Sequence, residues 1–415
     1  MNLRTILKYS SNRTLHRLLI CFLTVLLCYV MFLLLLASWF TWGYVVHERH
    51  LCDKCLNGGI KQCGMILFES GNVYDPDFLS EIIEMEEIVG FTCGDVYQSP
   101  NDEIEKYSEQ QKKLDPEYFE NIGFMPWFYM NQLGVEVCQF KLREGKYPDD
   151  WKLADDERLI YFGGNFQNVT VGEKFESNQE PITYVVGGVL ETGTNWICDE
   201  VYMFESVQDS HYVQCLDNMI VCLQPYMISN RNTYCIKKEY RMEDVEAKIL
   251  KIAEKYDVGI KLARLKDVIK ENEYQLSFII NMIRMLTLII IITALIVLER
   301  TQYSEMINDT EYFGIFFANG ASMRDLIAIL LGENIIKIVI SFVLAVISGY
   351  YIIRFQWQMF QPGIDQWRIA RDVYFGQAML PSMVIGVGII VLATIRTIKW
   401  LKNKNPAELL QNYKT

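Results

Sequence analysis

The stretch EYFGIFFANGASMRD, from Glu311 to Asp325, lies between two long apolar runs of the sequence, at 276–298 and 326–353. Each run is long enough for a helical membrane crossing, which takes about 20 apolar residues. The stretch itself is too polar at its ends to cross a bilayer and too apolar in its middle for an ordinary solvated loop. The sequence therefore predicts a specialised segment that two membrane helices hold on one side of the bilayer.

Two further apolar runs, at 18–46 and 379–400, bring the number of predicted transmembrane helices to four. A cleaved signal peptide is the alternative interpretation of the first run. Its apolar core far exceeds the roughly 7–15 residues of a signal peptide, and no small-residue cleavage site follows promptly. We interpret 18–46 as an uncleaved anchor.

The charges next to the runs predict the orientation. Residues 1–17, interpreted as an amphipathic segment, carry four arginines or lysines and no acid, and the tail 401–415 is also basic. Under the positive-inside rule both termini are cytoplasmic. Residues 47–275 and the loop 354–378 are then extracellular, and 299–325 is cytoplasmic. The stretch 48–273 holds 42 acids and 23 bases, a net charge of −19, so the acidity of the chain is that of its outer domain.

Nine of the 11 cysteines fall in this outer segment, which leaves three interpretations open. An oxidising exterior would favour a disulfide framework with one thiol left over. Cys52-x-x-Cys55 followed by Cys63 would alternatively form part of a zinc or redox site, although no second matched pair follows. An anaerobic exterior that leaves most thiols free also fits the odd number.

The residue pattern at each end of the outer segment predicts a strand, a helix and a second strand. The patterns 63–70, 76–88 and 89–96 form the first unit, and 233–240, 243–256 and 259–268 form the second. They predict one α/β subdomain made from two halves, 59–140 and 197–275, around a β-rich insertion at 141–196. Leu265–Tyr274 then continues without Gly or Pro into the second apolar run, which predicts a stiff helical stalk and disfavours a flexible tether.

Motifs for catalysis are missing from the sequence. The glycine pairs Gly163-Gly164 and Gly187-Gly188 are not followed by Lys-Ser/Thr, so they indicate turns and bulges and not a phosphate loop. No G-x-S-x-G or H-E-x-x-H supports the alternative of an outer-surface enzyme. We expect no enzymatic activity in this chain.

Several motifs resemble those of the FtsX-like, or MacB-type, permease family of ABC transporters. In the outer segment they are LREGKYP (142–148), LIYFGGNF with VTVGEKFE (159–176) and ITYVVGGVLETG (182–193). On the cytoplasmic side they are GIFFANGAS (314–322) and NPAELL (405–410). One position departs from the pattern, because Tyr312 stands where the family has a glutamate. The resemblance covers essentially the whole chain.

The resemblance implies an α-helical membrane protein with four transmembrane helices and a large extracellular α+β domain between the first and second, the MacB-type (type VII) ABC permease fold. It also implies that 299–325 contains a coupling segment that docks on a separate ATPase. An interfacial re-entrant stretch is the alternative. Aromatic and aliphatic side chains would anchor the partner, Gly320 would end a short helix and Ser322 would cap the next. The docking residues so implied are Phe313, Gly314, Ile315, Phe316, Phe317, Gly320, Ala321, Ser322 and Arg324.

The resemblance places Pro406, Glu408 and Leu409 against the same partner, with a frayed, solvated tail as the alternative. It implies two copies of an ABC ATPase that bind ATP and magnesium, a second permease subunit in a homo- or heterodimer, a bacterial cell membrane and no nucleic acid. This chain itself would bind no cofactor and no metal. The complex would export or extract a peptide or a hydrophobic compound by mechanotransmission, and the acidic outer domain would suit a cationic peptide. The alternative is a complex that regulates a cell-wall hydrolase or a sensor.

Glu333 and Lys337 are four residues apart in the third apolar run and would lie on one helix face. Ionisable groups inside a membrane mark ion paths in some proteins. With a single pair near the cytoplasmic end, we interpret them as a structural, neutralising pair.

Overall fold

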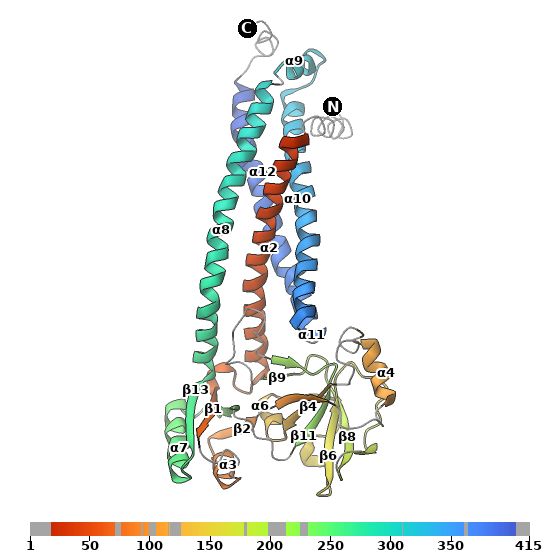
Figure 1. The fold of residues 1–415 in the computed structure, drawn as a ribbon, viewed down its shortest axis with the longest axis vertical. Coiled ribbons are helices and arrows are strands. Elements are labelled where there is room, and N and C mark those ends of the chain that lie inside the picture. Colours follow the sequence, from red (N-terminus) through yellow and green to blue (C-terminus); the bar gives the residue numbers. More distant parts are fainter. Residues whose placement is uncertain are drawn as a thin grey trace. The chain divides into compact units, whose positions relative to one another are not determined.

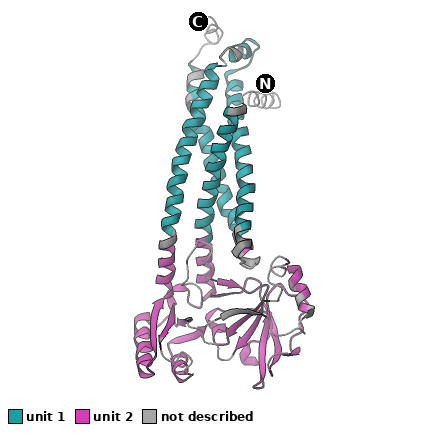
Figure 2. Ribbon diagram, in the orientation of Figure 1, with its two compact units in different colours: residues 1–44, 277–359, 370–415 teal, residues 45–276, 360–369 magenta. Residues whose placement is uncertain are grey.

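The computed structural model describes residues 18–70, 76–92, 94–98, 105–114, 116, 126–177, 181–197, 213–224, 231–308, 310–360 and 364–403. The chain divides into two compact units, which Figure 2 shows in different colours. Unit 1 comprises residues 1–44, 277–359 and 370–415, and unit 2 comprises 45–276 and 360–369. Each unit is described by itself.

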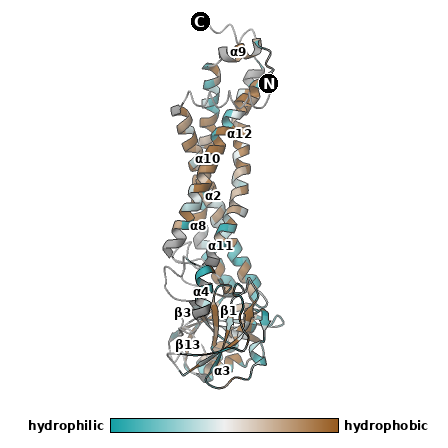
Figure 3. Ribbon diagram, turned by 90° about the vertical axis from the view of Figure 1, so that its right-hand side faces the viewer, coloured by the Kyte–Doolittle hydropathy of each residue, from teal (hydrophilic) through white to brown (hydrophobic). Residues whose placement is uncertain are grey.

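Unit 1 is built from long helices. Four helices in the described part of the chain are long and apolar enough to cross a membrane, which confirms the four predicted spans. Figure 3 shows hydrophobic residues along them. Large apolar side chains such as Phe22 and Val384 stay exposed on these helices, as expected of surfaces that face lipid. The helices are α2 (Leu18–Cys55), α8 (Leu265–Asn308), α10 (Met323–Phe360) and α12 (Met379–Lys402).

Two of these helices extend past the predicted spans (Figure 1). Helix α2 runs on to Cys55, beyond the expected end at 46, and α8 begins at Leu265, without a break before the apolar run. The continuity predicted for the stalk is therefore present in α8.

The segment 354–378, expected as a loop, is mostly helical. Helix α10 continues to Phe360, and α11 (Ile364–Val373) leads through a π-helical turn, η6 (Tyr374–Ala378), into α12. The π turn directs the buried Tyr374 to a hydroxyl hydrogen bond with the carbonyl oxygen of Val346, 2.9 Å away. A Cβ on Gly349 would lie 2.6 Å from that hydroxyl oxygen, so only glycine leaves room for the contact.

Unit 2 contains a four-stranded sheet in the order β13-β1-β12-β2, with every neighbour antiparallel. The two strand–helix–strand segments interleave, which is the split βαβ arrangement of ferredoxin-like folds. Strands from the two ends of the outer segment therefore belong to one sheet. Its elements are β1 (Cys63–Ser70), α3 (Pro76–Ile83), β2 (Ile88–Thr92), β12 (Arg231–Ile236), α7 (Met242–Lys255) and β13 (Gly259–Arg264). Helices α3 and α7 supply Phe78, Ile82, Val245 and Ile249 to a core against the sheet.

The second sheet has the order β3-β4-β11-β6-β8-β5, and β7 pairs with β8. Its strands are β3 (Gly94–Gln98), β4 (Pro126–Asn131), β5 (Leu142–Gly145), β6 (Glu157–Phe162), β7 (Lys174–Glu176), β8 (Thr183–Leu190) and β11 (Ile220–Gln224). The insertion is thus larger than the predicted 141–196, because β4 and β11 pair in parallel across a long sequence separation. The shorter elements of unit 2 are η1 (Ile60–Gln62), α4 (Glu105–Leu114), α6 (Gly134–Val137), η3 (Pro148–Asp150), β9 (Asn195–Ile197) and β10 (Val213–Cys215).

The glycine pairs belong to this sheet and its turns. A Cβ on Gly188 would lie 2.3 Å from the carbonyl oxygen of Glu144 in β5, and one on Gly163 would lie 2.0 Å from that of Leu216. The glycines permit close backbone approach, as the interpretation of turns and bulges requires.

The cysteines show one pairing among the described residues. Cys63 and Cys235 face each other across β1 and β12 and form a disulfide. A cysteine in a disulfide is not a zinc ligand, so Cys63 does not complete a zinc site with Cys52 and Cys55, and no group of three potential metal ligands occurs in the described ranges. Cys93 and Cys198 lie outside the described residues. Among the other described cysteines of the outer segment, Cys55 and Cys222 are free thiols.

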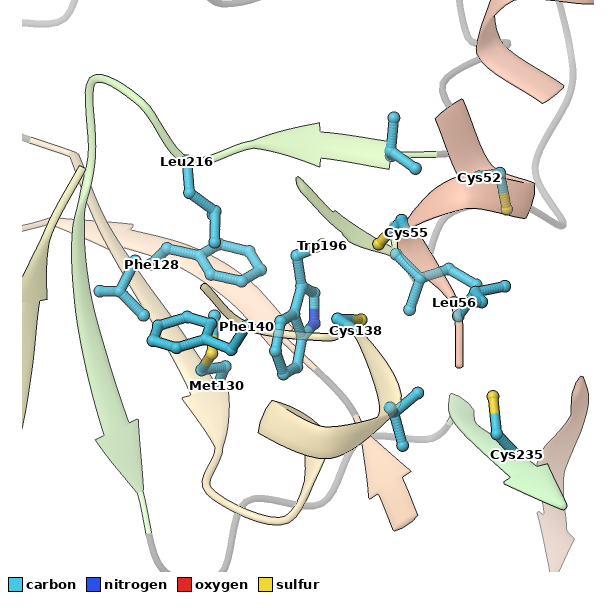
Figure 4. Packing of buried hydrophobic residues seen from close by; sticks show 14 of the residues in the cluster. Cys52, Cys55, Leu56, Phe128, Met130, Cys138, Phe140, Trp196, Leu216 and Cys235 are labelled. Atoms are coloured by element: carbon cyan, nitrogen blue, oxygen red, sulfur yellow. The ribbon is translucent and has the colours of Figure 1, made fainter. Parts of the chain in front are cut away.

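One buried cluster in unit 2 joins the end of α2 to the start of α8 (Figure 4). Helix α2 contributes Cys52 and Cys55, and α8 contributes Leu265, Val268 and Ile269. Trp196, Phe128 and Met130 fill the centre of the same cluster. Between the two helices, Arg49 donates to both carboxylate oxygens of Glu273 at 3.2 Å.

An ion pair on the four-stranded sheet predicts a pH-dependent contribution to stability. The largely buried carboxylate of Glu87 accepts a hydrogen bond from Lys248 on α7, and this bond lowers the pKa of Glu87. A folded pKa below the unfolded value of about 4.3 stabilises the fold above that pH, and the contribution is lost as the pH falls through the folded pKa.

We therefore expect Glu87→Gln to lower the melting temperature of the detergent-solubilised chain at pH 7. Because Lys248 is more than half exposed, the loss should stay at or below about 1 kcal/mol. The difference in melting temperature between the variant and the wild type should shrink below about pH 4. Tryptophan fluorescence on heating measures both melting temperatures. Glu84→Gln, at an exposed neighbouring position, is the control. An equal difference in melting temperature at pH 7 and pH 3 would contradict a stabilising ion pair of Glu87 with Lys248.

Candidate functional site

The segment 309–322 between α8 and α10 contains a short helix, α9 (Thr310–Ala318). It ends at Gly320, whose φ of +84° is the left-handed conformation that glycine adopts most easily. The amide of Ala321 donates to the carbonyl of Phe316 at 2.9 Å, and that of Asn319 donates to Ile315 at 3.0 Å. This is a Schellman-type end, so the predicted role of Gly320 is confirmed.

Ser322 begins the next helix, as predicted. The amide of Asp325 donates to its hydroxyl oxygen at 3.4 Å, while the amide and hydroxyl of Ser322 donate to the Asp325 carboxylate at 2.9 and 2.7 Å. This reciprocal capping fixes the point at which α10 starts. The C-terminal end of α9 and the start of α10 are therefore both well defined.

An apolar cluster holds α9 against its flanking helices. Phe313 is 1% exposed and packs with Met306 from α8 and with Leu326, Ile329 and Leu330 from α10. Phe316 packs partly against the same cluster. The ring of Phe313, expected on the partner surface, therefore faces the interior and positions α9 instead.

The exposed part of this segment is small and mixed in chemistry. Ile315 is 48% exposed, whereas Gly314 is buried and Ala321 is partly exposed. Phe317 lies within α9, but its side chain is outside the described residues. We call the following exposed set the α9 surface: Ile315, Ala318, Asn319, Gly320, Ser322 and Arg324.

The α9 surface combines one large apolar side chain, Ile315, with one cation, Arg324, among small and polar residues. An exposed aliphatic side chain beside an arginine would serve as an anchor for a partner protein. The docking role predicted for this segment stays a prediction.

Below α9, polar side chains form a buried layer across three helices. Lys337 on α10 forms an ion pair with Glu305 on α8 at 3.7 Å, and both side chains are less than a tenth exposed. The sequence predicted Glu333 as the neutralising partner of Lys337, and the structure records Glu305 of α8 as an ion-pair partner of Lys337. Asn334 donates to Gln302 at 3.1 Å and to Thr394 on α12 at 3.3 Å.

Sequence reasoning missed Gln302, Glu305, Asn334 and Thr394. Their contacts join different helices, so no spacing within one helix reveals the partners. A signal was present in the two i, i+3 pairs, Gln302 with Glu305 and Asn334 with Lys337, because each places two polar groups on one helix face.

The C-terminal contact residues Pro406, Glu408 and Leu409 lie outside the described residues, as does the segment 1–17. Their role in partner binding stays a prediction.

The sequence model of a family described as FtsX-like permease C-terminal matches residues 274–406. The match contains α9 and the apolar parts of α8, α10 and α12. No curated protein matches the chain.

Two solved structures are similar to this chain. The periplasmic region of MacB from Actinobacillus actinomycetemcomitans aligns over 51% of this chain and 92% of its own, with 9% identity and a TM-score of 0.30. The extracellular domain of the noncanonic ABC-type transporter YknZ from Gram-positive bacteria aligns over 48% and 98%, with 6% identity and a TM-score of 0.27. No conclusion about function rests on these two likenesses.

Phe313 offers a test of the packing below the α9 surface. We expect Phe313→Ala to leave a cavity and to destabilise the local packing by about 3–5 kcal/mol, enough to loosen α9. Limited proteolysis of the purified chain should then cut between 308 and 322 much faster than in the wild type. Ile315→Ala, at an exposed position of the same helix, is the matched control and should change the cleavage rate little. Equal cleavage of both variants would refute the anchoring role.

Proposed function

We propose that this chain is the permease subunit of an ABC transporter, with a separate ATPase docked on the α9 surface, because residues 274–406 match the model of the FtsX-like permease C-terminal domain. The observation that carries the proposal is a short helix with a Schellman-type C-terminal end and an exposed isoleucine, which Phe313 packs against the ends of two long apolar helices. The sequence lacks a nucleotide-binding motif, so ATP and magnesium would bind to the partner chain.

The geometry of the docking segment favours the transfer of force. A push on the α9 surface acts on Phe313, which packs against both α8 and α10, so the displacement passes to the two helices together. The close packing of such clusters resists compression. Helix α8 then continues unbroken to Leu265.

The other end of α8 is also firmly held. Leu265 and Ile269 are buried in the same core as Cys52 of α2, and Arg49 links the two helices to each other through Glu273. Helical segments that are clamped at their ends transmit motion, whereas a flexible linker would dissipate it. We therefore propose mechanotransmission to unit 2 as the working principle.

The distribution of charge supports the orientation. Basic segments at both termini favour a cytoplasmic location for α9, where an ATPase would meet it, and an extracellular location for unit 2. The complete assembly would contain two ATPase copies and two permease subunits in a bacterial cell membrane. Its acidic outer domain would suit a cationic peptide as cargo.

A regulatory complex is the second candidate function. The same clamped helices would serve a complex that switches a cell-wall hydrolase or a sensor, because both tasks need force delivered to the outer domain and neither needs a conduit. Transport of a labelled peptide by reconstituted complex distinguishes the two: uptake that depends on ATP supports export, and ATP-driven activation of an outer partner without transport supports regulation.

The docking assignment predicts the effect of a charge on the α9 surface. We expect Ile315→Asp to weaken binding of the coexpressed ABC ATPase at least about tenfold, because a buried, unpaired carboxylate at an interface costs more than 1.4 kcal/mol. ATP turnover in proteoliposomes should fall in parallel. The double substitution of Phe316 and Phe317 by Asp should act in the same direction.

Leu250→Asp is the matched control. Leu250 is 44% exposed on α7 of unit 2, so it is an equally exposed apolar residue on a helix remote in sequence from α9. The control should retain both binding and turnover. Unchanged copurification of the ATPase with the Ile315→Asp variant would contradict docking on the α9 surface.

A further inference from the structure

Helices α2 and α10 lie side by side in unit 1 (Figure 1), and hydrogen bonds join them. The Tyr29 hydroxyl of α2 donates to the Ser348 hydroxyl of α10 at 3.0 Å. The Ser341 hydroxyl of α10 lies 3.0 Å from the carbonyl oxygen of Val25, to which it donates. These contacts fix the two walls of a groove that side chains of both helices line.

The groove has a volume of about 610 Å³, within the range of roughly 300–1,000 Å³ that sites for small molecules occupy. Its lining residues fall within 22–29 of α2 and 344–352 of α10, inside the predicted spans 18–46 and 326–353. None of these lining residues is charged. The groove therefore lies at the depth of the lipid hydrocarbon and suits an apolar occupant.

Large apolar side chains at the rim of the groove are exposed. Leu344 is 48% exposed, Ile347 and Ile352 are each 50% exposed, and Phe22 of α2 is 61% exposed. The medium around membrane-spanning helices is lipid, so these side chains meet acyl chains and not water. A molecule that enters the groove therefore comes from within the bilayer.

The lining offers hydroxyl groups but no charge that would hold an ionic head group. The Tyr29 hydroxyl donates to Ser348, whose own hydroxyl donates to the carbonyl oxygen of Leu344 at 2.8 Å. The hydroxyl hydrogens of this pair are therefore used within the protein. A carboxylate or phosphate in the groove would lie in hydrocarbon without a cation among the lining residues, which is unfavourable. The lining favours an uncharged hydrocarbon chain, with the head group of the lipid outside the groove.

The composition of the lining favours a flexible chain over a helix of a second copy of this protein. Transmembrane helices pack mostly through Gly, Ala, Ser and Thr, because small side chains let two backbones approach closely. Ser348 is the one small residue among those that line the groove, and the others are Val, Leu, Ile, Phe and Tyr. An acyl chain bends at each carbon and so follows an irregular apolar surface, where it gains dispersion contacts along its length.

We propose that the groove between α2 and α10 is a specific binding site for one acyl chain of a membrane lipid. The bound chain contacts both helices at once, so it stabilises the contact that Tyr29 and Ser348 make between them. The site depends only on the residues of unit 1 and on the bilayer, and it goes beyond the proposed docking of an ATPase. Any effect of the bound lipid on force transfer rests on the proposed function.

The experiment maps where a lipid chain contacts the full-length protein. The chain is reconstituted into vesicles of phosphatidylcholine, a small fraction of which carries a photoreactive diazirine midway along one acyl chain. After irradiation, the peptides that carry a lipid adduct are identified by mass spectrometry. We expect adducts to concentrate on residues 22–29 and 344–352. The lipid-facing side of α8, where Ile292 is 49% exposed, reports the background of lipid that merely surrounds the protein.

Two matched substitutions define the result. Ile347→Trp fills the groove, so it should reduce the adducts on 22–29 and 344–352 to the background measured on α8. Ile292→Trp adds the same side chain at an equally exposed position of α8, and it should leave the adducts in the groove unchanged. Melting temperatures establish that each variant is folded. The distribution of adducts on the wild type tests the proposal even if the Ile347→Trp variant does not fold.

Two outcomes would overturn the proposal. Equal adduct yields on the groove and on α8 in the folded wild type would mean that lipid surrounds the protein without a specific site. Disulfide-linked dimers of an Ile347→Cys variant that the wild type does not form, together with few adducts in the groove, would assign the groove to a second copy of the chain. Because neither readout involves an ATPase, a failure here is distinguishable from a failure of docking on the α9 surface.

Discussion

The burial of two helix ends in one apolar core is the constraint on which the rest of unit 2 depends. The residues of α2 from 47 to 55 are largely polar, and nothing in their intrinsic propensity would prolong a membrane helix that far. Glu48, Cys52 and Cys55 recur at helical spacing and are buried, and the last two belong to the cluster that also receives Leu265 and Ile269 of α8. Because helix stability in proteins comes mostly from packing of one face, this core explains why α2 continues past the apolar run.

In the short helix α9, local contacts determine the C-terminal end, and packing determines the position of the helix. The helix end at Gly320 and the reciprocal contacts of Ser322 with Asp325 depend on residues that are close in the sequence. Their roles were therefore predictable from the amino-acid sequence. The face of α9 that packs against α8 and α10 was not predictable from the sequence. Four aromatic or aliphatic residues occur in 313–317, and the tertiary contact with Met306 and Leu330 buries Phe313 while Ile315 stays exposed.

The difference between local signals and tertiary contacts also explains which other features the sequence could and could not predict. Four apolar runs and two amphipathic strand–helix–strand patterns produced the four spans and the split βαβ sheet, because each is a signal within one continuous stretch. The extent of the second sheet escaped prediction, since β4 and β11 pair only across a long separation. The position of the Tyr374 hydroxyl likewise could not be predicted, because it lies against Gly349 of another helix.

The polar layer under α9 shows why such interhelical contacts are consequential. An ion pair whose members are both nearly inaccessible loses hydration that its mutual attraction only partly restores, so it adds little net stability. The ion pair instead fixes the register of α8 against α10. Sliding α8 against α10 by one turn would separate Lys337 from Glu305 and would also break the hydrogen bonds of Asn334 to Gln302 and Thr394. A displaced arrangement would leave several buried polar groups unsatisfied at once, each at a cost of roughly 1–3 kcal/mol. The layer therefore resists sliding of the helices that carry α9, and a push on α9 is expected to move α8 and α10 as one body.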